Sequence, residues 1–302
     1  MELKKVLSGI EGLKAKGNLD VDVNKIECDS KKITNGDMFV AIKGFDNDGH
    51  KYLDEAIENG AKVIIVEEGC KFSKEKLTDD ITVVVCQNSR ELLAIASCNF
   101  YKNPSKKFNL IGITGTKGKT TTAFMLKAIL EKHGQKVGMI GTIANYIGDE
   151  KISESSRTTP ESIELQQMLA KMAEEKVDTV IMEVSSQSLK LNRVDGCDFD
   201  IGVFTNFSKD HISKKEHTDM EDYYNSKVKL FTMCKTAYIN ADDFYVAKLK
   251  NKNLSCEIKT FGIDNSADLI AKDLTVTNTT SDFKVKIDTK NERIKVSIPR
   301  KI

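Results

Sequence analysis

The feature that most constrains this chain is a glycine-rich loop between an apolar run and a helical pattern, within residues 108–122. The apolar run contains β-branched isoleucines and predicts a short buried strand. The loop Gly115-x-x-Gly118-Lys119-Thr120 follows, and the next segment has helical apolar spacing. Such an arrangement places backbone N–H groups and a lysine where they can bind phosphate. The sequence therefore predicts a nucleotide-binding α/β domain.

The loop is shorter than the common phosphate loop. The common form spaces its two glycines more widely, and here Ile113 stands where its first glycine would be. A glycine-rich turn that binds nothing is the alternative. We expect the loop amides and the lysine to hold phosphate, and the threonine after the lysine to hold Mg²⁺. The candidate nucleotide-binding residues are Gly115, Thr116, Lys117, Gly118, Lys119, Thr120 and Thr121.

Charge and cysteine usage narrow the class of protein. The 302 residues carry 46 Lys and Arg against 45 Asp and Glu, which gives no electrostatic reason to expect nucleic acid. The seven cysteines are scattered and never form a C-x-x-C pair, so we expect a reducing compartment rather than disulfides or zinc. The N-terminus lacks a signal-peptide pattern and no stretch is long and apolar enough to span a membrane. We therefore expect a cytoplasmic protein without a membrane partner.

The patterns predict two domains. Residues 1–105 read as a small α/β domain, and a polar segment around Pro104 marks the boundary. Residues 106–302 read as a second α/β domain with a mostly parallel sheet and antiparallel strands at one edge. Strands are predicted at residues 37–42, 63–66, 81–85, 137–140, 178–184, 199–207, 257–262, 269–277, 283–287 and 294–298, and helices at 49–60, 89–101, 122–133, 159–176 and 221–231.

Polar side chains follow two of these strands. Glu183 lies near the carboxyl end of one strand, and His211 comes soon after another. Ligands of open α/β sheets bind at the carboxyl ends of the strands, so we expect both residues near the phosphate loop. A carboxylate there can coordinate the Mg²⁺ of a nucleotide. A strand-end glutamate without a ligand is the alternative for Glu183, and a solvated side chain is the alternative for Lys227 in the helix at 221–231.

Four motifs in this order resemble the Mur ligases, the ATP-dependent amide-forming enzymes of peptidoglycan precursor synthesis. The loop at residues 114–122 is similar to their phosphate loop, and 182–186 to their metal-binding strand end. Residues 204–211 are similar to their Thr-Asn-…-Asp-His motif. Residues 223–231 resemble the helix that bears the family's carbamylated lysine. The turn at Ser30, the loop at residues 44–50 and the segment at 157–166 resemble the MurE-type branch.

The resemblance implies roles for individual residues. It implies ATP and Mg²⁺ as cofactors, with Lys119, His211 and Lys227 as catalytic residues and Lys227 as a carbamate. It implies UDP-N-acetylmuramoyl-L-alanyl-D-glutamate and an amino acid as substrates. The implied metal ligands are Thr120, Glu183, His211 and Lys227; the implied substrate-binding residues are Thr158, Thr159, Ser185 and Arg193 for the muramoyl-peptide and Ser30, Phe45, Asp46 and Asn47 for the uridine. Gln187 and Leu191 depart from residues common in these motifs.

The resemblance also sets expectations for the whole chain. The central domain is expected to be incomplete at its C-terminal end and the amino-acid-binding domain to be absent, so we expect a fragment that cannot complete ligation alone. The full-length family is expected to be monomeric. Which amino acid is added, meso-diaminopimelate or L-lysine, stays open. A folylpolyglutamate synthase relative and a non-catalytic module that binds the UDP-muramoyl-peptide are the alternatives.

Overall fold

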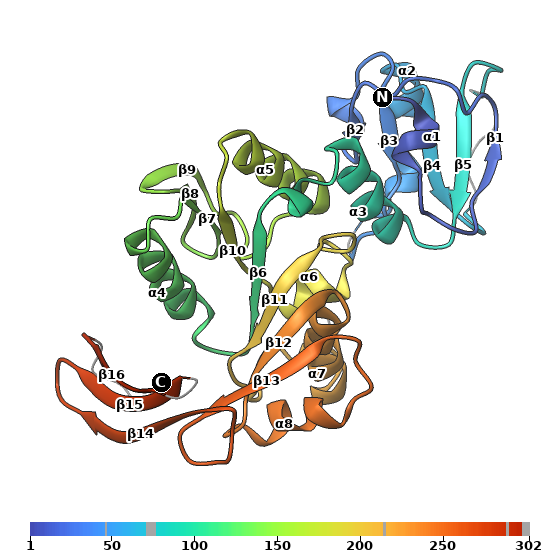
Figure 1. Ribbon diagram of the computed structural model, residues 1–302. Coiled ribbons are helices and arrows are strands. Elements are labelled where there is room, and N and C mark those ends of the chain that lie inside the picture. The colour runs from blue at the N-terminus through green and yellow to red at the C-terminus, as the bar shows by residue number, and fades with distance from the viewer. Residues whose placement is uncertain (46, 71–76, 214–215, 288–289, 298–302) are drawn as a thin grey trace. The chain divides into compact units, whose positions relative to one another are not determined.

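The computed structural model describes residues 1–45, 47–70, 77–213, 216–287 and 290–297. The chain divides into two compact units. The first unit comprises residues 1–108, 160–176 and 188–197, and the second comprises residues 109–159, 177–187 and 198–302. Figure 1 shows the helices and strands of both. No helix in the described part of the chain is long and apolar enough to cross a membrane.

The first unit is built on a five-stranded sheet with the order β1-β5-β4-β3-β2. Its strands pair in parallel except for β1, which is antiparallel to β5. The strands are β1 (Lys14–Lys16), β2 (Ile26–Glu27), β3 (Met38–Val40), β4 (Val63–Glu67) and β5 (Thr82–Cys86). The helices are α1 (Leu3–Val6), η1 (Ser30–Lys32), η2 (Gly49–Tyr52), α2 (Leu53–Glu58), α3 (Ser89–Phe100), η3 (Pro104–Lys107) and α5 (Ser162–Glu174).

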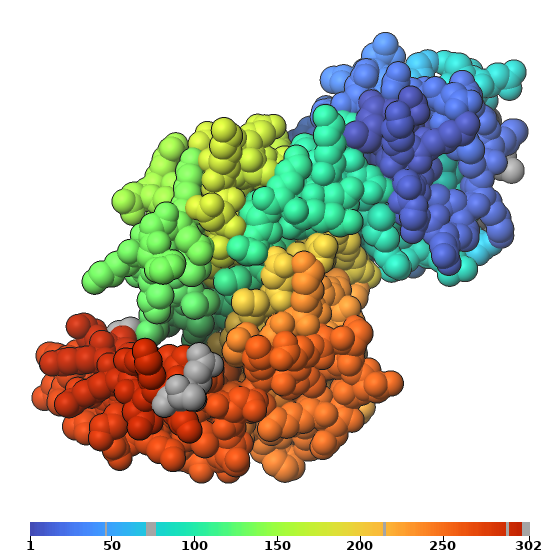
Figure 2. Space-filling view, in the orientation of Figure 1, coloured from blue at the N-terminus to red at the C-terminus, as the bar shows by residue number. Residues whose placement is uncertain are grey.

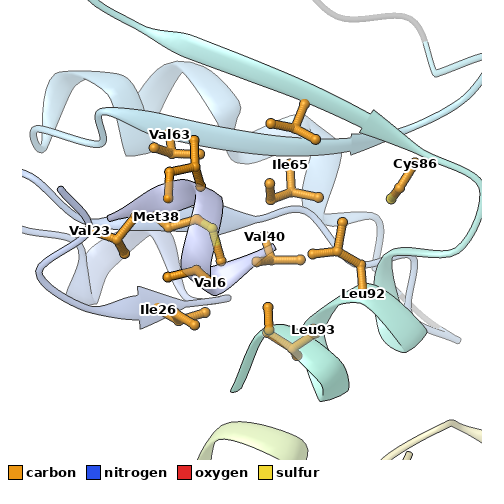
Figure 3. Close-up of a cluster of buried hydrophobic side chains, with 13 residues drawn as sticks. Val6, Val23, Ile26, Met38, Val40, Val63, Ile65, Cys86, Leu92 and Leu93 are labelled. Atoms are coloured by element: carbon orange, nitrogen blue, oxygen red, sulfur yellow. The ribbon is translucent and has the colours of Figure 1, made fainter. Parts of the chain in front are cut away.

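The central strands of this sheet are buried on both faces, which explains their continuous apolar runs. On one face, Met38, Val40 and Ile65 pack with Leu92 and Leu93 of α3 (Figure 3). A separate buried cluster covers the opposite face and includes residues of α2. The Asn88 side chain caps helix α3 at its start, because it accepts hydrogen bonds from the backbone N–H groups of Arg90 and Glu91.

The second unit contains an eleven-stranded sheet with the order β16-β15-β14-β13-β12-β11-β6-β10-β7-β8-β9. Strands β14 to β7 in this order pair in parallel, and antiparallel strands extend both edges. The strands are β6 (Asn109–Thr114), β7 (Val137–Ile140), β8 (Ala144–Ile147), β9 (Glu150–Glu154), β10 (Thr179–Glu183), β11 (Phe199–Phe204), β12 (Cys234–Asn240), β13 (Glu257–Gly262), β14 (Leu269–Val276), β15 (Ser281–Ile287) and β16 (Lys290–Val296). The predicted fold class, α/β with a mostly parallel sheet and antiparallel edge strands, is confirmed.

The remaining helices are α4 (Lys119–Lys132), α6 (Ser186–Lys190), α7 (Met220–Val228), η4 (Lys229–Thr232), α8 (Phe244–Ala247) and η5 (Lys248–Asn251). Helix α4 packs on β6, β7 and β10, and the glycine-rich loop connects the end of β6 to the start of α4. In the space-filling view of Figure 2, the strands β14 to β16 appear in red as one continuous surface at their end of the sheet.

Several local predictions differ from the structure. The sequence patterns missed β12 and the antiparallel strands β8 and β9. The helix predicted at 159–176 begins three residues later, at Ser162, and the Thr159 hydroxyl donates a hydrogen bond to the backbone oxygen of Glu183. The predicted strand at 199–207 ends at Phe204, because the chain leaves the sheet there to bond the glycine-rich loop.

Candidate active site

The glycine-rich loop connects β6 to α4, and residues far along the chain hold it. Asn206 clamps Lys117 from both sides: its Oδ1 accepts from the Lys117 N–H at 2.9 Å, and its Nδ2 donates to the Lys117 carbonyl at 3.0 Å. Thr116 donates its N–H to the Asn206 carbonyl oxygen. Gly118 stands at the N-cap of α4 with φ of 84°, a conformation that favours glycine, and no side chain caps this helix. The N-terminus of α4 can therefore receive an anion.

Glu183 ends β10 and lies against the start of α4. Its side chain is almost fully buried, with 1% of its surface exposed. Oε2 accepts hydrogen bonds from the Thr120 hydroxyl at 2.8 Å and from the Thr142 hydroxyl at 3.0 Å, and Oε1 accepts the Thr142 N–H at 3.0 Å. Gly141 makes room for this carboxylate, since a Cβ there would lie 3.1 Å from the Glu183 Cδ and closer still to Oε1. The strand-end acid and the loop threonine predicted to share Mg²⁺ thus lie together.

Two lysines, the half-buried Lys119 and the buried Lys227, reach the same backbone carbonyl. Lys119 Nζ and Lys227 Nζ each donate to the Gly115 carbonyl oxygen at 2.9 Å. Lys227 is 1% exposed and its ammonium lies 4.6 Å from the centre of the Tyr223 ring. Burial lowers the pKa of Lys119, and the nearby Glu183 charge partly opposes that effect. Burial and then repulsion from Lys119 hold the pKa of Lys227 well below its usual range.

A neutral amine is what carbamate formation requires, because the nitrogen lone pair attacks CO₂. The depressed pKa of Lys227 raises the neutral fraction at physiological pH. A solvated lysine, the alternative drawn from the sequence, is wrong because the side chain is buried against the phosphate loop.

His211 lies in the loop after β11, with φ of 55° and a side chain that is 47% exposed. Its Nδ1 is 3.0 Å from a Glu216 carboxylate oxygen. Its ring centre is 5.9 Å from that of Tyr223, the residue that Lys227 also contacts. Within the described residues, no group of three or more His, Cys, Asp and Glu side chains is arranged to hold a metal. His211 and Lys227 thus both lie near Tyr223, whereas Glu183 is hydrogen-bonded to Thr120 at the start of α4.

The predicted peptide-binding residues fall in both units. In the second unit, the Thr159 hydroxyl donates to the Glu183 carbonyl oxygen at 2.9 Å and accepts the Ser185 N–H at 3.0 Å. Thr158 Oγ1 is 3.1 Å from Thr142 Oγ1. In the first unit, Arg193 is buried and its guanidinium lies 2.8 Å from the Glu161 carboxylate. Thr158, Thr159 and Ser185 therefore lie together beside Glu183.

The predicted uridine-binding residues all belong to the first unit. The buried Ser30 hydroxyl donates to Glu55 on α2 at 2.5 Å. Phe45 is 55% exposed, and the Asn47 side chain donates to the Tyr52 hydroxyl at 3.0 Å. Asp46 lies outside the described residues. An exposed aromatic ring on a polar loop is available to a ligand, whereas Ser30 already has a carboxylate partner.

Sequence reasoning gave no individual role to Thr142, to Tyr223 or to Asn206, the asparagine of the motif at residues 204–211, yet all three contact candidate site residues. Thr142 and Asn206 follow the carboxyl ends of β7 and β11. The rule that ligands gather at the carboxyl ends of parallel strands could have found both residues. Tyr223 had no such signal, because its contact with Lys227 depends on how α7 packs.

Comparison with known proteins agrees with this geometry. The family model described as the Mur ligase middle domain matches residues 113–301, well over half of the chain. A second model, described as the Mur ligase family catalytic domain, matches residues 22–101. This chain belongs to the Mur ligase family. Its phosphate loop, Glu183 and Lys227 all lie within the part matched by the middle domain.

Curated relatives within the Mur ligase family match the chain over its whole length. A protein from Clostridium botulinum, named UDP-N-acetylmuramoyl-L-alanyl-D-glutamate--2,6-diaminopimelate ligase, is 46% identical over 100% of this chain and 61% of the relative. A protein of the same name from Clostridium tetani is 44% identical over 99% of this chain and 60% of the relative. The chain thus spans about three fifths of the length of these relatives.

Solved structures share the Mur ligase fold. A structure of a UDP-N-acetylmuramoyl-L-alanyl-D-glutamate--2,6-diaminopimelate ligase has a TM-score of 0.80 and 23% identity, covering 99% of this chain and 60% of that chain. The MurF ligase of Thermotoga maritima in complex with ADP has a TM-score of 0.52 and 20% identity over 90% of this chain and 58% of that chain. A folylpolyglutamate synthase of Mycobacterium tuberculosis has a TM-score of 0.53 and 15% identity, over 65% of this chain and 51% of that chain.

Proposed function

We propose that this chain provides the acceptor-binding and nucleotide-binding parts of an ATP-dependent ligase of peptidoglycan precursor synthesis. The ligase joins 2,6-diaminopimelate to UDP-N-acetylmuramoyl-L-alanyl-D-glutamate. One observation carries the proposal: the buried Glu183 carboxylate and the Thr120 hydroxyl, 2.8 Å apart, lie at the uncapped start of the helix that follows the phosphate loop. The names of the relatives support diaminopimelate as the added amino acid, with L-lysine as the outcome that a substrate test would distinguish.

The residues present fit a magnesium nucleotide. Oxygen donors are the ligands that Mg²⁺ prefers, and Mg²⁺ usually binds through one or two carboxylates together with substrate phosphates. Glu183 and Thr120 would hold the ion, which when bound neutralises the negative charge that develops between the β- and γ-phosphates. The Thr120 hydroxyl can donate its hydrogen to Glu183 and still offer an oxygen lone pair. Lys119 and the loop N–H groups would bind the phosphate oxygens.

The reaction then follows from charge placement. An oxygen of the acceptor carboxylate attacks the γ-phosphorus of ATP, and the bond to the β,γ-bridging oxygen breaks to release ADP. The neutral amine of the amino acid attacks the resulting acyl phosphate, an amide bond forms, phosphate leaves with the electrons of the carbon–oxygen bond, and the nitrogen releases one proton to solvent. The first step brings anions together, so the Lys119 ammonium on the Gly115 carbonyl oxygen lies where positive charge lowers the barrier.

Lys227 is proposed to act as a carbamate. Its neutral amine would attack CO₂, form a nitrogen–carbon bond and release one proton, which turns a hydrogen-bond donor into an anionic oxygen ligand. His211 and this carbamate, whose side chains both lie near Tyr223, would hold a second Mg²⁺. The depressed pKa of Lys227 supports this assignment.

Substrate positions are proposed from the resemblance and from exposure. Thr158, Thr159, Ser185 and Arg193 would bind the muramoyl-peptide. Ser30 and the loop with Phe45, Asp46 and Asn47 would bind the uridine. The proposal places the protein in the cytoplasm, where ATP is available and where the seven cysteines, all free in the structure, would remain reduced.

Calorimetric titration tests the acceptor assignment. UDP-N-acetylmuramoyl-L-alanyl-D-glutamate is titrated into the chain, with UDP and a reduced folate as matched controls. Binding clearly tighter than that of UDP supports the proposal. Binding of the folate in place of the muramoyl-peptide would favour the folylpolyglutamate synthase alternative. A folded chain that binds none of the three would refute the acceptor assignment. Binding of the muramoyl-peptide without ATP consumption, even when any missing C-terminal segment is supplied, would favour the non-catalytic module.

A further inference from the structure

We infer that Thr142 is a positioning residue that sets the Glu183 carboxylate for the metal and couples it to the peptide-binding residue Thr158. The inference rests on the proposed function and adds a residue that lies outside the four sequence motifs. Thr142 makes two of the three hydrogen bonds to the Glu183 carboxylate, one from its N–H and one from its hydroxyl.

The backbone around Thr142 is shaped for this contact. Gly141 is buried and passes so close to Glu183 that its Cβ position would lie 3.3 Å from Cγ and 3.1 Å from Cδ. The two residues directly follow β7, which pairs with β10, the strand that Glu183 ends. The residues that follow β7 therefore pack against and hydrogen-bond the Glu183 side chain at the end of β10.

The direction of the hydrogen bonds can be derived. A carboxylate only accepts, so the single hydrogen of the Thr142 hydroxyl points to Glu183 Oε2 at 3.0 Å. Across the 3.1 Å contact with Thr158, Thr142 must then accept and Thr158 must donate. The hydrogen bonds therefore all run in one direction: Thr158 donates to Thr142, and Thr142 donates to Glu183.

This order couples two ligands. When Glu183 shares its charge with a cation, it attracts the Thr142 hydrogen less strongly, and the Thr142 oxygen becomes a weaker acceptor for Thr158. The Thr158 hydroxyl is then released more easily to donate to a carboxylate of the acceptor. Metal–nucleotide binding and acceptor binding should therefore strengthen each other, and linkage requires the effect to be reciprocal.

The test compares Thr142→Val, which keeps the shape and the N–H but lacks the hydroxyl, with Thr142→Ser, which keeps the hydroxyl. Calorimetry measures the affinity of each chain for ADP with and without Mg²⁺. In Thr142→Val the gain in affinity from Mg²⁺ should fall by about tenfold, the change expected from one lost hydrogen bond to a charged group. ADP affinity without Mg²⁺ should stay the same, and Thr142→Ser should behave like the wild type.

A second titration measures coupling. Mg²⁺ and ADP together should raise wild-type affinity for UDP-N-acetylmuramoyl-L-alanyl-D-glutamate by about fivefold, a typical coupling, and Thr142→Val should lose this gain. The inference is overturned if Thr142→Val keeps the wild-type gain from Mg²⁺, or if Thr142→Ser loses as much as Thr142→Val. The nucleotide titration needs no acceptor, so it decides the role of Thr142 at Glu183 even if the acceptor assignment fails.

Discussion

Replacement of Gly141 by alanine tests whether the Glu183 carboxylate packs as tightly against Gly141 as the structure indicates. The backbone of Gly141 is not in the left-handed region, so alanine adds a methyl group without backbone strain. That methyl carbon would lie 3.1 Å from the Glu183 Cδ. Carbon atoms in contact prefer about 3.5–4.0 Å, so the carboxylate must retreat by roughly 0.5–1 Å.

The retreat has a defined cost. The three hydrogen bonds to Glu183 measure 2.8, 3.0 and 3.0 Å, near the usual length. A shift of this size breaks at least one of them, and a hydrogen bond to a charged group contributes about 1.5–3 kcal/mol. Alanine also restricts the unfolded chain, which restores about 0.4–1 kcal/mol. We expect Gly141→Ala to lower the free energy of unfolding by about 1–2 kcal/mol.

Urea unfolding and ADP titration with and without Mg²⁺ measure the two effects of Gly141→Ala. The matched control is Gly262→Ala, because its methyl group would approach another carboxylate, 3.1 Å from Asp242 Oδ1, and that carboxylate accepts hydrogen bonds from the backbone of residues 263–265. The control should leave the gain in ADP affinity from Mg²⁺ unchanged, whereas Gly141→Ala should reduce it. Combining Gly141→Ala with Glu183→Asp, which shortens the acid by one methylene, should cost less than the sum of the two changes. If Gly141→Ala changes neither the urea midpoint nor the gain in ADP affinity from Mg²⁺, the tight packing of Glu183 against Gly141 is refuted.

Three other predictions concern the loop and its lysines. In ¹³C-bicarbonate, NMR should detect a carbamate carbon that is lost in Lys227→Met. The signal should be kept in the control Lys127→Met, since Lys127 is buried but ion-paired with Glu131. A signal that survives Lys227→Met would contradict the carbamate. Asn206→Leu removes both hydrogen bonds to Lys117 and should weaken ADP binding, measured by calorimetry, by about tenfold or more. An unchanged affinity would show that these hydrogen bonds do not position the loop for ADP. The hydrogen bond from Lys117 lowers the pKa of Asp210 in the folded protein. This pair therefore stabilises the fold at pH values above about 3.9, the ordinary aspartate pKa, and the stabilisation is lost as the pH falls through the lowered pKa of the folded state. Because Lys117 is 75% exposed, Asp210→Asn should lower the free energy of unfolding at pH 7 by at most about 1 kcal/mol, and the difference should vanish in acid; a difference that persists there would refute the linkage.

Local patterns predicted most of the secondary structure, and the exceptions have physical causes. The strand at Glu257–Gly262 was predicted with its observed bounds because turn residues flank a compact β-prone run. Strand β12 was missed because it alternates between buried and half-exposed residues in a short segment between helical patterns. Thr159 fits a helix cap by its sequence, but a bond to the Glu183 carbonyl oxygen, 24 residues away, takes its hydroxyl.

The sequence by itself determined the Mur ligase motifs, the phosphate loop and the strand-end position of Glu183. These features are local: glycines, a lysine and a threonine between a strand and a helix define their geometry over a few residues. Only the tertiary structure brought Lys227 to the carbonyl oxygen of Gly115, 112 residues away, and buried it. Only the tertiary structure placed Thr142 between Glu183 and Thr158. Such contacts depend on which strands become neighbours and on what covers them, and burial then sets the chemistry of each side chain.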